Sequence, residues 1–287
     1  MSELGKKEII AIAKHFLISS PPGEFEQVKK DVEEIVDNEE ILNSDEFKNV
    51  FYEYNVEQFT PVNTDAEDEK SRMFIICSYN QVGDDKTKFR DPVSKQIFEI
   101  DHVTSKVIGS SPDETTFTEK QQTRRETIQK SIDEYVKNAF IDTMGRGSNE
   151  PHGVSSVFAD VKDENKYVIV ISASKHNEKN QWSGRWRSVY QVTFSDADKI
   201  DIVGKMKVNI HNFETGNTLM NTSREAKGEL KDIKEDLKSK LNTWELGFQN
   251  YIYDQCASFD DIFKVGIRRD RPVQGLFNFT NLGGMIQ

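Results

Sequence analysis

Cysteine, long apolar runs and catalytic motifs are all scarce in this chain of 287 residues. Only Cys77 and Cys256 occur, without the paired spacing of a disulfide framework or a cysteine metal site. The longest apolar run, at 167–173, is far shorter than the roughly 20 residues that span a bilayer as a helix. No apolar leader follows Met1. We therefore expect a cytoplasmic protein without a transmembrane segment.

Net positive charge is also lacking. The chain carries 38 Lys and Arg against 49 Asp and Glu, a formal net charge of -11. Nucleic acids and anionic membranes bind to basic surfaces, because the basic groups release counterions from the polyanion. We therefore exclude nucleic acid as a partner, and we expect any cationic site to be local.

Recognisable catalytic patterns are missing as well. The chain has no phosphate-binding loop, no nucleophile elbow, no HExxH and no Cys-His cluster. Its five histidines are scattered. We predict that the protein is not an enzyme and has no catalytic residues, cofactor or metal. Abundant carboxylates leave an enzyme with an unrecognised carboxylate site as a less favoured alternative.

What the chain does contain is helical periodicity at its start. Apolar residues recur at three and four within 9–16, 25–36 and 47–54, which predicts three helices. The prolines and glycine of "SSPPGEF" at 19–25 separate the first two. Asn43 with Glu46 predicts a capping box that opens the third helix.

The next segments change in character. "RMFIICSY" and "KQIFEIDHV" within 72–112 predict short strands, with "NQVGDDKTKFRDP" as the loop between them. Ile128, Ile132 and Tyr135 then belong to a fourth helical stripe. We expect a small strand-and-loop module followed by a helix.

Residues 153–224 form the clearest β region. "KYVIVISAS", "GRWRSVYQVTF" and "GKMKVNIHNF" are joined by short turns, which predicts an antiparallel sheet with one polar face. Alternation places Trp186 and Tyr190 on the apolar face, with Arg185 and Arg187 on a solvated face. A contact surface that includes Trp182 and the two arginines is the less favoured alternative.

A long helical stripe follows the sheet. Its apolar members step by three or four residues without a gap, so we predict a helix lying on the sheet. Such a two-layer domain is suited to completion by a second subunit. Such a stripe is more often core than a partner groove, and here it can serve as both. The stripe, which we predict as the subunit interface, consists of Leu230, Ile233, Leu237, Leu241, Trp244, Phe248 and Tyr251.

Five short sequences carry a resemblance to a known family. They are "PPGEF" at 21–25, "YNVEQFTPV" at 54–62, "FRDP" at 89–92, "WSGRWRS" at 182–188 and "GNT" at 216–218. In this order they resemble the alpha subunit of the heterodimeric F-actin capping protein, the CapZ family. The resemblance covers nearly the whole chain.

The resemblance implies an α+β fold in four regions: a helical stalk at 1–62, a small β module at 63–114, a helix, antiparallel sheet and long helix at 115–262, and a tail at 263–287. It also implies an obligate heterodimer with a beta subunit, whose sheet joins this one. That dimer would cap the barbed end of actin filaments in the cytoskeleton, blocking subunit addition and loss. Protein regulators of capping are further expected partners.

The family's tail carries a basic cluster that contacts actin. Residues 263–287 carry a net charge of +3, which leaves -14 on the rest of the chain. The gap of Val265, Gly266 and Ile267 is one residue longer than in the family's Phe-Lys-x-Leu-Arg-Arg, so a dimeric scaffold without barbed-end activity stays open. The predicted actin-binding residues are Lys264, Arg268, Arg269, Arg271, Leu276, Phe277, Phe279 and Leu282.

Overall fold

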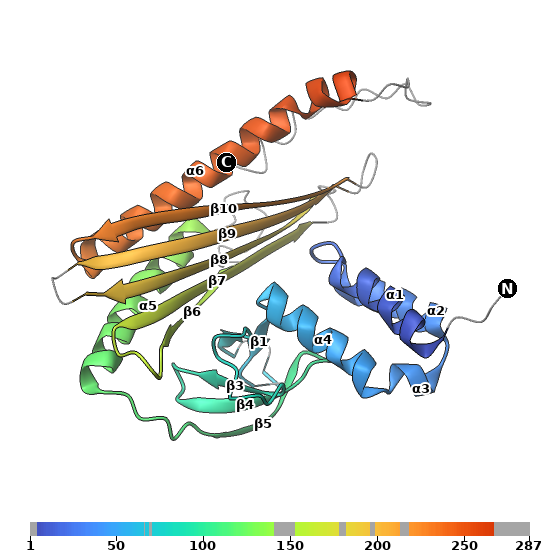
Figure 1. Cartoon of the computed structure of the whole chain (residues 1–287), viewed down its shortest axis with the longest axis horizontal. Coiled ribbons are helices and arrows are strands. Elements are labelled where there is room, and N and C mark those ends of the chain that lie inside the picture. The colour runs from blue at the N-terminus through green and yellow to red at the C-terminus, as the bar shows by residue number, and fades with distance from the viewer. Residues whose placement is uncertain are drawn as a thin grey trace.

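The computed structural model describes residues 5–65, 67–68, 71–140, 153–177, 182–195, 199–212 and 218–266. The side chains at 176–177, 182, 212, 218 and 255–266 lie outside this description. The described elements form an α+β protein with antiparallel sheets and a long final helix (Figure 1), which confirms the predicted fold class.

The N-terminal region contains the three predicted helices and one short additional helix. They are α1 (Lys6–Ile18), α2 (Phe25–Val36), α3 (Glu39–Leu42) and α4 (Asp45–Gln58). The predicted cap of α4 is wrong: the hydroxyl of Ser44 accepts the Phe47 N–H at 3.4 Å, whereas Asn43 ends α3. The Asn38 side chain caps the short helix α3, and Asn43 is the C-cap of that helix. The N-cap of α4 is therefore Ser44, one residue later than predicted.

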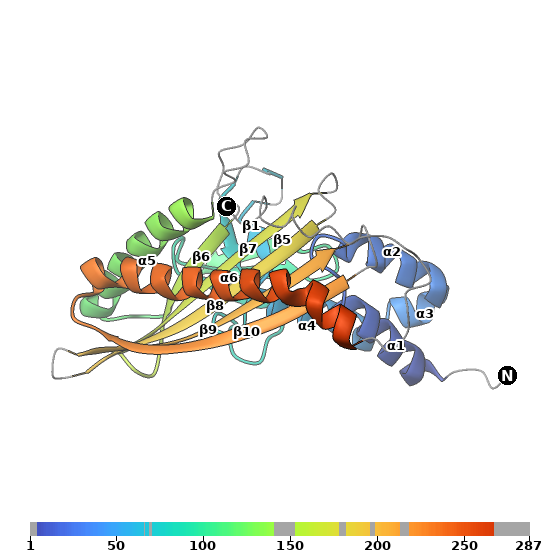
Figure 2. The ribbon, with the colours of Figure 1, turned by 90° about the horizontal axis from the view of Figure 1, so that it is seen from above.

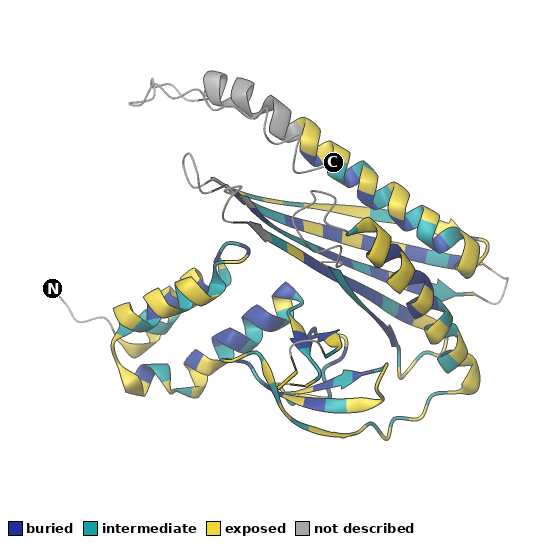
Figure 3. Ribbon diagram, turned by 180° about the vertical axis from the view of Figure 1, so that it is seen from behind, coloured by how far each residue is buried: buried dark blue, intermediate teal, exposed yellow. Residues whose placement is uncertain are grey.

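The third predicted apolar stripe, within 47–54, is buried throughout, but only part of each of the first two is buried. Ala13, Leu17 and Phe51 belong to a buried cluster shared by the helices. Phe16 and Ile35 instead remain exposed at 53% and 80%. Helices α1 and α2 form a projection beside the body of the molecule (Figures 1 and 3), whereas α4 also packs against the small β module and β8.

Two small antiparallel sheets follow the helices. Strand β1 (Pro61–Asn63) pairs with β2 (Met73–Ile75), and β3 (Lys88–Asp91), β4 (Gln96–Asp101) and β5 (Lys106–Pro112) form a three-stranded sheet. Strands β2 and β4 were predicted, but β3 and β5 fall in segments rich in Gly, Asp, Ser and Pro that read as loops. Pairing on both edges of β4 makes these segments extended despite their composition.

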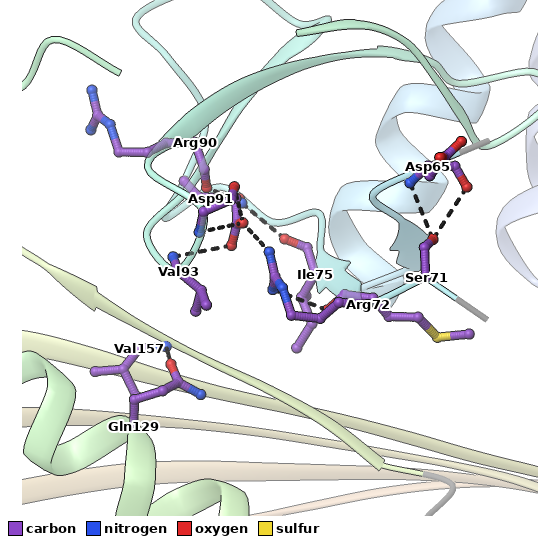
Figure 4. Close-up of polar contacts among 12 residues, drawn as sticks. Asp65, Ser71, Arg72, Ile75, Arg90, Asp91, Val93, Gln129 and Val157 are labelled. Atoms are coloured by element: carbon purple, nitrogen blue, oxygen red, sulfur yellow. Dashed lines mark hydrogen bonds and ion pairs between the residues drawn. The ribbon is translucent and has the colours of Figure 1, made fainter. Parts of the chain in front are cut away.

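The "FRDP" sequence has a structural role in the β3–β4 turn. The Asp91 carboxylate is fully buried and accepts the backbone N–H groups of Val93 and Ser94. It also forms an ion pair with Arg72, as Figure 4 shows. Asp91 thus ties the turn to the segment that leads into β2.

The main sheet is a five-stranded antiparallel meander in the order β10-β9-β8-β7-β6. Its close packing requires a glycine at position 204, where an added Cβ would lie 2.3 Å from Cδ1 of Tyr190. The strands are β6 (Gly153–Ala159), β7 (Lys166–Asn177), β8 (Trp182–Phe194), β9 (Ile200–Asn212) and β10 (Thr218–Leu230).

Two helices cover one face of this sheet. Helices α5 (Glu119–Ala139) and α6 (Ile233–Gly266) lie over the strands (Figures 1 and 2) and enclose the largest apolar cluster, which includes Ile132, Tyr190 and Phe248. A sheet with a wholly polar second face was expected, and that expectation is wrong. Val170 and Phe158 form a separate buried cluster there with Ile75 and Cys77 of the small module.

The four-region division at 62, 114 and 262 stays a prediction. Separate apolar clusters lie in the helical projection, in the small module and between the main sheet and its helices. No helix of the described chain is both long enough and apolar enough to cross a membrane.

Candidate subunit and actin interface

Helix α6 lies along the main sheet and diverges from it toward its C-terminal end (Figure 1). Its 34 residues correspond to about 50 Å at about 1.5 Å per residue. At its start the Asp232 carboxylate accepts the N–H groups of Lys234 and Glu235, and Asp236 accepts those of Lys231 and Asp232. These backbone bonds lower the pKa of Asp236, so its carboxylate stabilises the helix start as an anion.

The structure places most of the predicted interface stripe inside this chain's own core. Leu237, Leu241 and Phe248 are completely buried against the sheet, and Leu230 nearly so. Ile233 and Trp244 pack on the same cluster, being partly buried. Tyr251 is the exception at 49% exposure. The stripe therefore holds α6 on its own sheet, and only its exposed members are free to meet a second subunit.

Sequence reasoning missed Glu245, which lies on the buried side of α6 at 4% exposure. Its carboxylate accepts hydrogen bonds from the hydroxyls of Tyr135, Ser188 and Tyr190, each at 2.7 Å. The Ser188 hydroxyl in turn accepts the Trp186 indole N–H at 2.7 Å. One carboxylate thus joins α6 to α5 and to β8. Its position between Leu241 and Phe248, one turn from each, was the available signal.

Burial controls the protonation of this cluster. Desolvation raises the pKa of Glu245, although its hydroxyl donors oppose the shift. Burial and the nearby carboxylate also raise the pKa values of Tyr135 and Tyr190. Both tyrosines therefore remain hydrogen-bond donors across the physiological pH range. We assign the cluster a structural role, because its hydrogen bonds hold α6, the helix that precedes the tail, against α5 and β8.

The two arginines of "GRWRS" also depart from the prediction of a solvated face. Arg187 is 5% exposed and donates to the Glu57 carbonyl oxygen at 2.8 Å and to Asn209. Desolvation lowers its pKa to about 10. Arg185 donates to Gln58 Oε1 at 2.7 Å and to the Tyr54 hydroxyl at 2.8 Å. Helix α4 covers this face, so the arginines fasten it to β8 and are not available as a contact surface.

Replacing Arg185 with Ala is expected to lower the free energy of unfolding by about 1 to 3 kcal/mol, because two hydrogen bonds and a cation contact with the Tyr54 ring are lost. Urea unfolding followed by circular dichroism measures the change. Lys205→Ala is the matched control: Lys205 is an exposed sheet cation paired with Glu225, and its loss should cost under about 1 kcal/mol. Equal losses in the two variants would refute the role of Arg185 as a fastener.

Strand β10 is the outer strand of the main sheet and pairs only with β9 among the described strands. An unpaired edge of this length presents N–H and C=O groups that can pair with another chain. Exposed apolar side chains lie on this strand and on α6: Leu219 at 42%, Leu246 at 49% and Tyr253 at 42%. Exposed surface along β10 and α6 is visible in Figure 3. We call this strand the β10 edge.

The predicted actin-binding residues lie at or beyond the limit of the description. Lys264 belongs to the last turns of α6, but its side chain is outside the described set. Arg268, Arg269, Arg271, Leu276, Phe277, Phe279 and Leu282 all fall outside the described residues. Their assignment stays a prediction. What the fold provides is a long helix, packed on the sheet over its first turns, that precedes them in the chain.

Comparison with known proteins identifies the family of this chain. The family model of the F-actin capping protein alpha subunit matches residues 13–284. The chain belongs to that family. The resemblance read from "PPGEF", "WSGRWRS" and the other short sequences is therefore confirmed.

Curated capping protein alpha subunits align over most of the chain. The F-actin-capping protein subunit alpha of Caenorhabditis elegans is 27% identical over 283 residues, 95% of this chain and 93% of the relative. That of Dictyostelium discoideum is 30% identical over 220 residues, 75% of this chain and 71% of the relative. Actin capping and binding to actin therefore characterise the proteins that this chain is similar to.

A solved structure shows the same fold. It is the homodimeric actin capping protein alpha subunit from Plasmodium berghei, with a TM-score of 0.69 and 21% identity, and the match covers 94% of this chain and 99% of that one. At this identity the likeness concerns the fold. Two of the five quoted sequences have structural roles in this chain. Asp91 of "FRDP" stabilises the β3–β4 turn, and the arginines of "WSGRWRS" donate hydrogen bonds from β8 to α4.

Proposed function

We propose that this chain is the alpha subunit of a dimeric capping protein that binds the barbed end of actin filaments and blocks the addition and loss of subunits. The observation that carries the proposal is the family match, which extends through the basic tail to residue 284. The protein acts by binding and not as an enzyme, in the cytoplasm and at the cytoskeleton. A second subunit and actin are its partners.

The charge distribution supports this function. Residues 263–287 carry a net charge of +3, and residues 1–262 carry a net charge of -14. Electrostatic attraction to an acidic filament end is therefore confined to the tail. The tail follows directly on helix α6, which diverges from the sheet toward its C-terminal end (Figure 1). The acidic body then limits non-specific adhesion while the tail attracts actin.

The β10 edge supports dimer formation. A partner strand added along Thr218–Leu230 would continue the sheet. The same partner would cover exposed Leu246 and Tyr253 on α6. We propose a beta subunit of similar fold as this partner. A second copy of the chain is the alternative assembly, favoured by the homodimeric Plasmodium berghei neighbour.

Seeded actin elongation tests the function. The full chain, co-expressed with a beta subunit, is expected to stop growth from barbed-end seeds at substoichiometric amounts relative to actin monomers, while growth at pointed ends continues. Pyrene fluorescence follows the rate. The full chain expressed alone and tested in parallel distinguishes the two assemblies. Undiminished barbed-end growth with both preparations would contradict the capping function and favour a dimeric scaffold without barbed-end activity.

A further inference from the structure

A small pocket lies where the β module meets α5 and β6, at the opposite edge of the main sheet from the β10 edge. Its volume is about 70 Å³. Its polar lining includes Arg90, Lys95, Asp113, Arg125 and Glu126. The apolar part of the wall is formed by Tyr79, Pro92, Phe117, Phe158 and Ala159.

Arg125 is the unusual member of this lining. Its side chain is only 11% exposed, and its Nη1 atom is buried without a hydrogen-bond partner in the described structure. Its one ion pair with a described residue joins it to Glu126 at 3.7 Å, and the Glu126 side chain is 60% exposed. A buried guanidinium N–H without an acceptor is costly. An acceptor group at this position would therefore be stabilised.

Other carboxylates near Arg125 are engaged elsewhere. Asp91 accepts bonds from Arg72 and from Ser94. Asp133 accepts from Gln129 at 2.7 Å and from Ser155 at 2.7 Å. Neither carboxylate forms a hydrogen bond with the guanidinium among the described residues, so both act on Arg125 only through space.

The other arginine of the pocket is already paired. Arg90 Nε lies 2.6 Å from Asp113, and its Nη2 donates to the Thr115 hydroxyl at 2.7 Å. With Lys95, Arg125 and Glu126 the lining carries a net charge of +1, in a chain whose net charge is -11. Lys95 is exposed and Arg90 is paired, so Arg125 is the buried cation of the lining whose Nη1 atom lacks a hydrogen-bond partner among the described residues.

We propose that this pocket binds a carboxylate group with an apolar stem, held by Arg125 with the stem against the aromatic wall. A carboxylate fits the planar guanidinium with two parallel bonds. The wall of Phe117, Phe158 and Pro92 favours a hydrocarbon stem over a fully hydrated anion such as phosphate. The carboxylate can come from a free small acid or from an acidic side chain of a bound peptide.

Titration of the full chain with sodium hexanoate, followed by isothermal calorimetry, tests the proposal. Saturable binding is expected, with hexanamide and inorganic phosphate each at least about tenfold weaker. Arg125→Gln should weaken hexanoate binding by about tenfold or more, the loss of a charge-assisted pair of bonds. Lys130→Gln, an exposed cation on the same helix, should leave it unchanged. Absent binding, or equal binding of hexanamide or phosphate, would overturn the proposal.

Thermal unfolding separates this role from a structural one. Without hexanoate, Arg125→Gln is expected to melt no lower than the wild type, because among the described residues Nη1 has no hydrogen-bond partner and the ion pair with exposed Glu126 is long. A melting temperature several degrees lower would mean that Arg125 holds the fold and would refute the site. An acetylated, amidated tetrapeptide with a central Glu then identifies the source: tighter binding than hexanoate indicates a protein ligand, and weaker binding indicates a free acid.

Discussion

Deleting residues 273–287 is expected to raise the rate at which the dimer leaves barbed ends by tenfold or more, with dimer assembly unchanged. The deleted segment contains Leu276, Phe279 and Leu282 at helical spacing, and each buried apolar anchor contributes roughly 1.5 to 3 kcal/mol. Lost contacts of this kind act mainly on dissociation. Single-filament microscopy measures dwell times directly. Unchanged dwell times would show that the tail is not the actin-binding element.

The basic cluster should act on the other rate. Arg268→Glu combined with Arg269→Glu is expected to slow association, because charges outside a tight contact act mainly by steering. The association rate of this variant should also respond less to added salt than that of the wild type. Lys6→Glu with Lys7→Glu changes the net charge equally at two exposed sites in α1. If that control slowed association as much, net charge and not the tail would be the cause.

Replacing Glu245 with Ala is expected to lower the free energy of unfolding by at least about 3 kcal/mol. The change leaves the buried hydroxyls of Tyr135, Ser188 and Tyr190 without their acceptor, and each unsatisfied donor costs about 1 to 3 kcal/mol. It also leaves a cavity under α6. Urea unfolding measures the loss. A cost similar to that of exposed Glu235→Ala would show that the cluster contributes nothing.

Glu245→Gln isolates the charge of the same group. Burial raises the pKa of Glu245 in the folded state. The stability that it contributes is therefore fully present below its unfolded-state pKa and is lost as pH rises through the folded-state value. The glutamine variant lacks this loss, so it should gain stability relative to the wild type between pH 4 and pH 8.

The control for this pH effect has the opposite sign. Lys238 lowers the pKa of exposed Glu134, so the contribution of Glu134 is present at high pH and is lost on acidification. Glu134→Gln should therefore lose stability relative to the wild type as pH rises. If Glu245→Gln and Glu134→Gln moved in the same direction, burial would not control Glu245.

Periodicity alone predicted the elements whose apolar residues are regularly spaced. The stripes of α2, α5 and α6 and the alternation in β8 and β9 identify their types, because one face of each must be removed from water. Strands β3 and β5 carry no such pattern. They are extended because β4 offers hydrogen bonds on both edges, a property of the neighbour and not of their own residues.

Motifs, periodicity and charge are local properties of the chain, so they were enough to predict the family, the fold class and a basic tail on an acidic chain. The use of individual polar residues could be seen only in the folded molecule. Arg187 alternates as a solvent-facing residue would, yet α4 covers it. Glu245 is a charged residue on the apolar side of α6, yet it is buried because three hydroxyls from α5 and β8 donate hydrogen bonds to its carboxylate. Burial of a polar group depends on partners far away in sequence, and only folding brings those partners together.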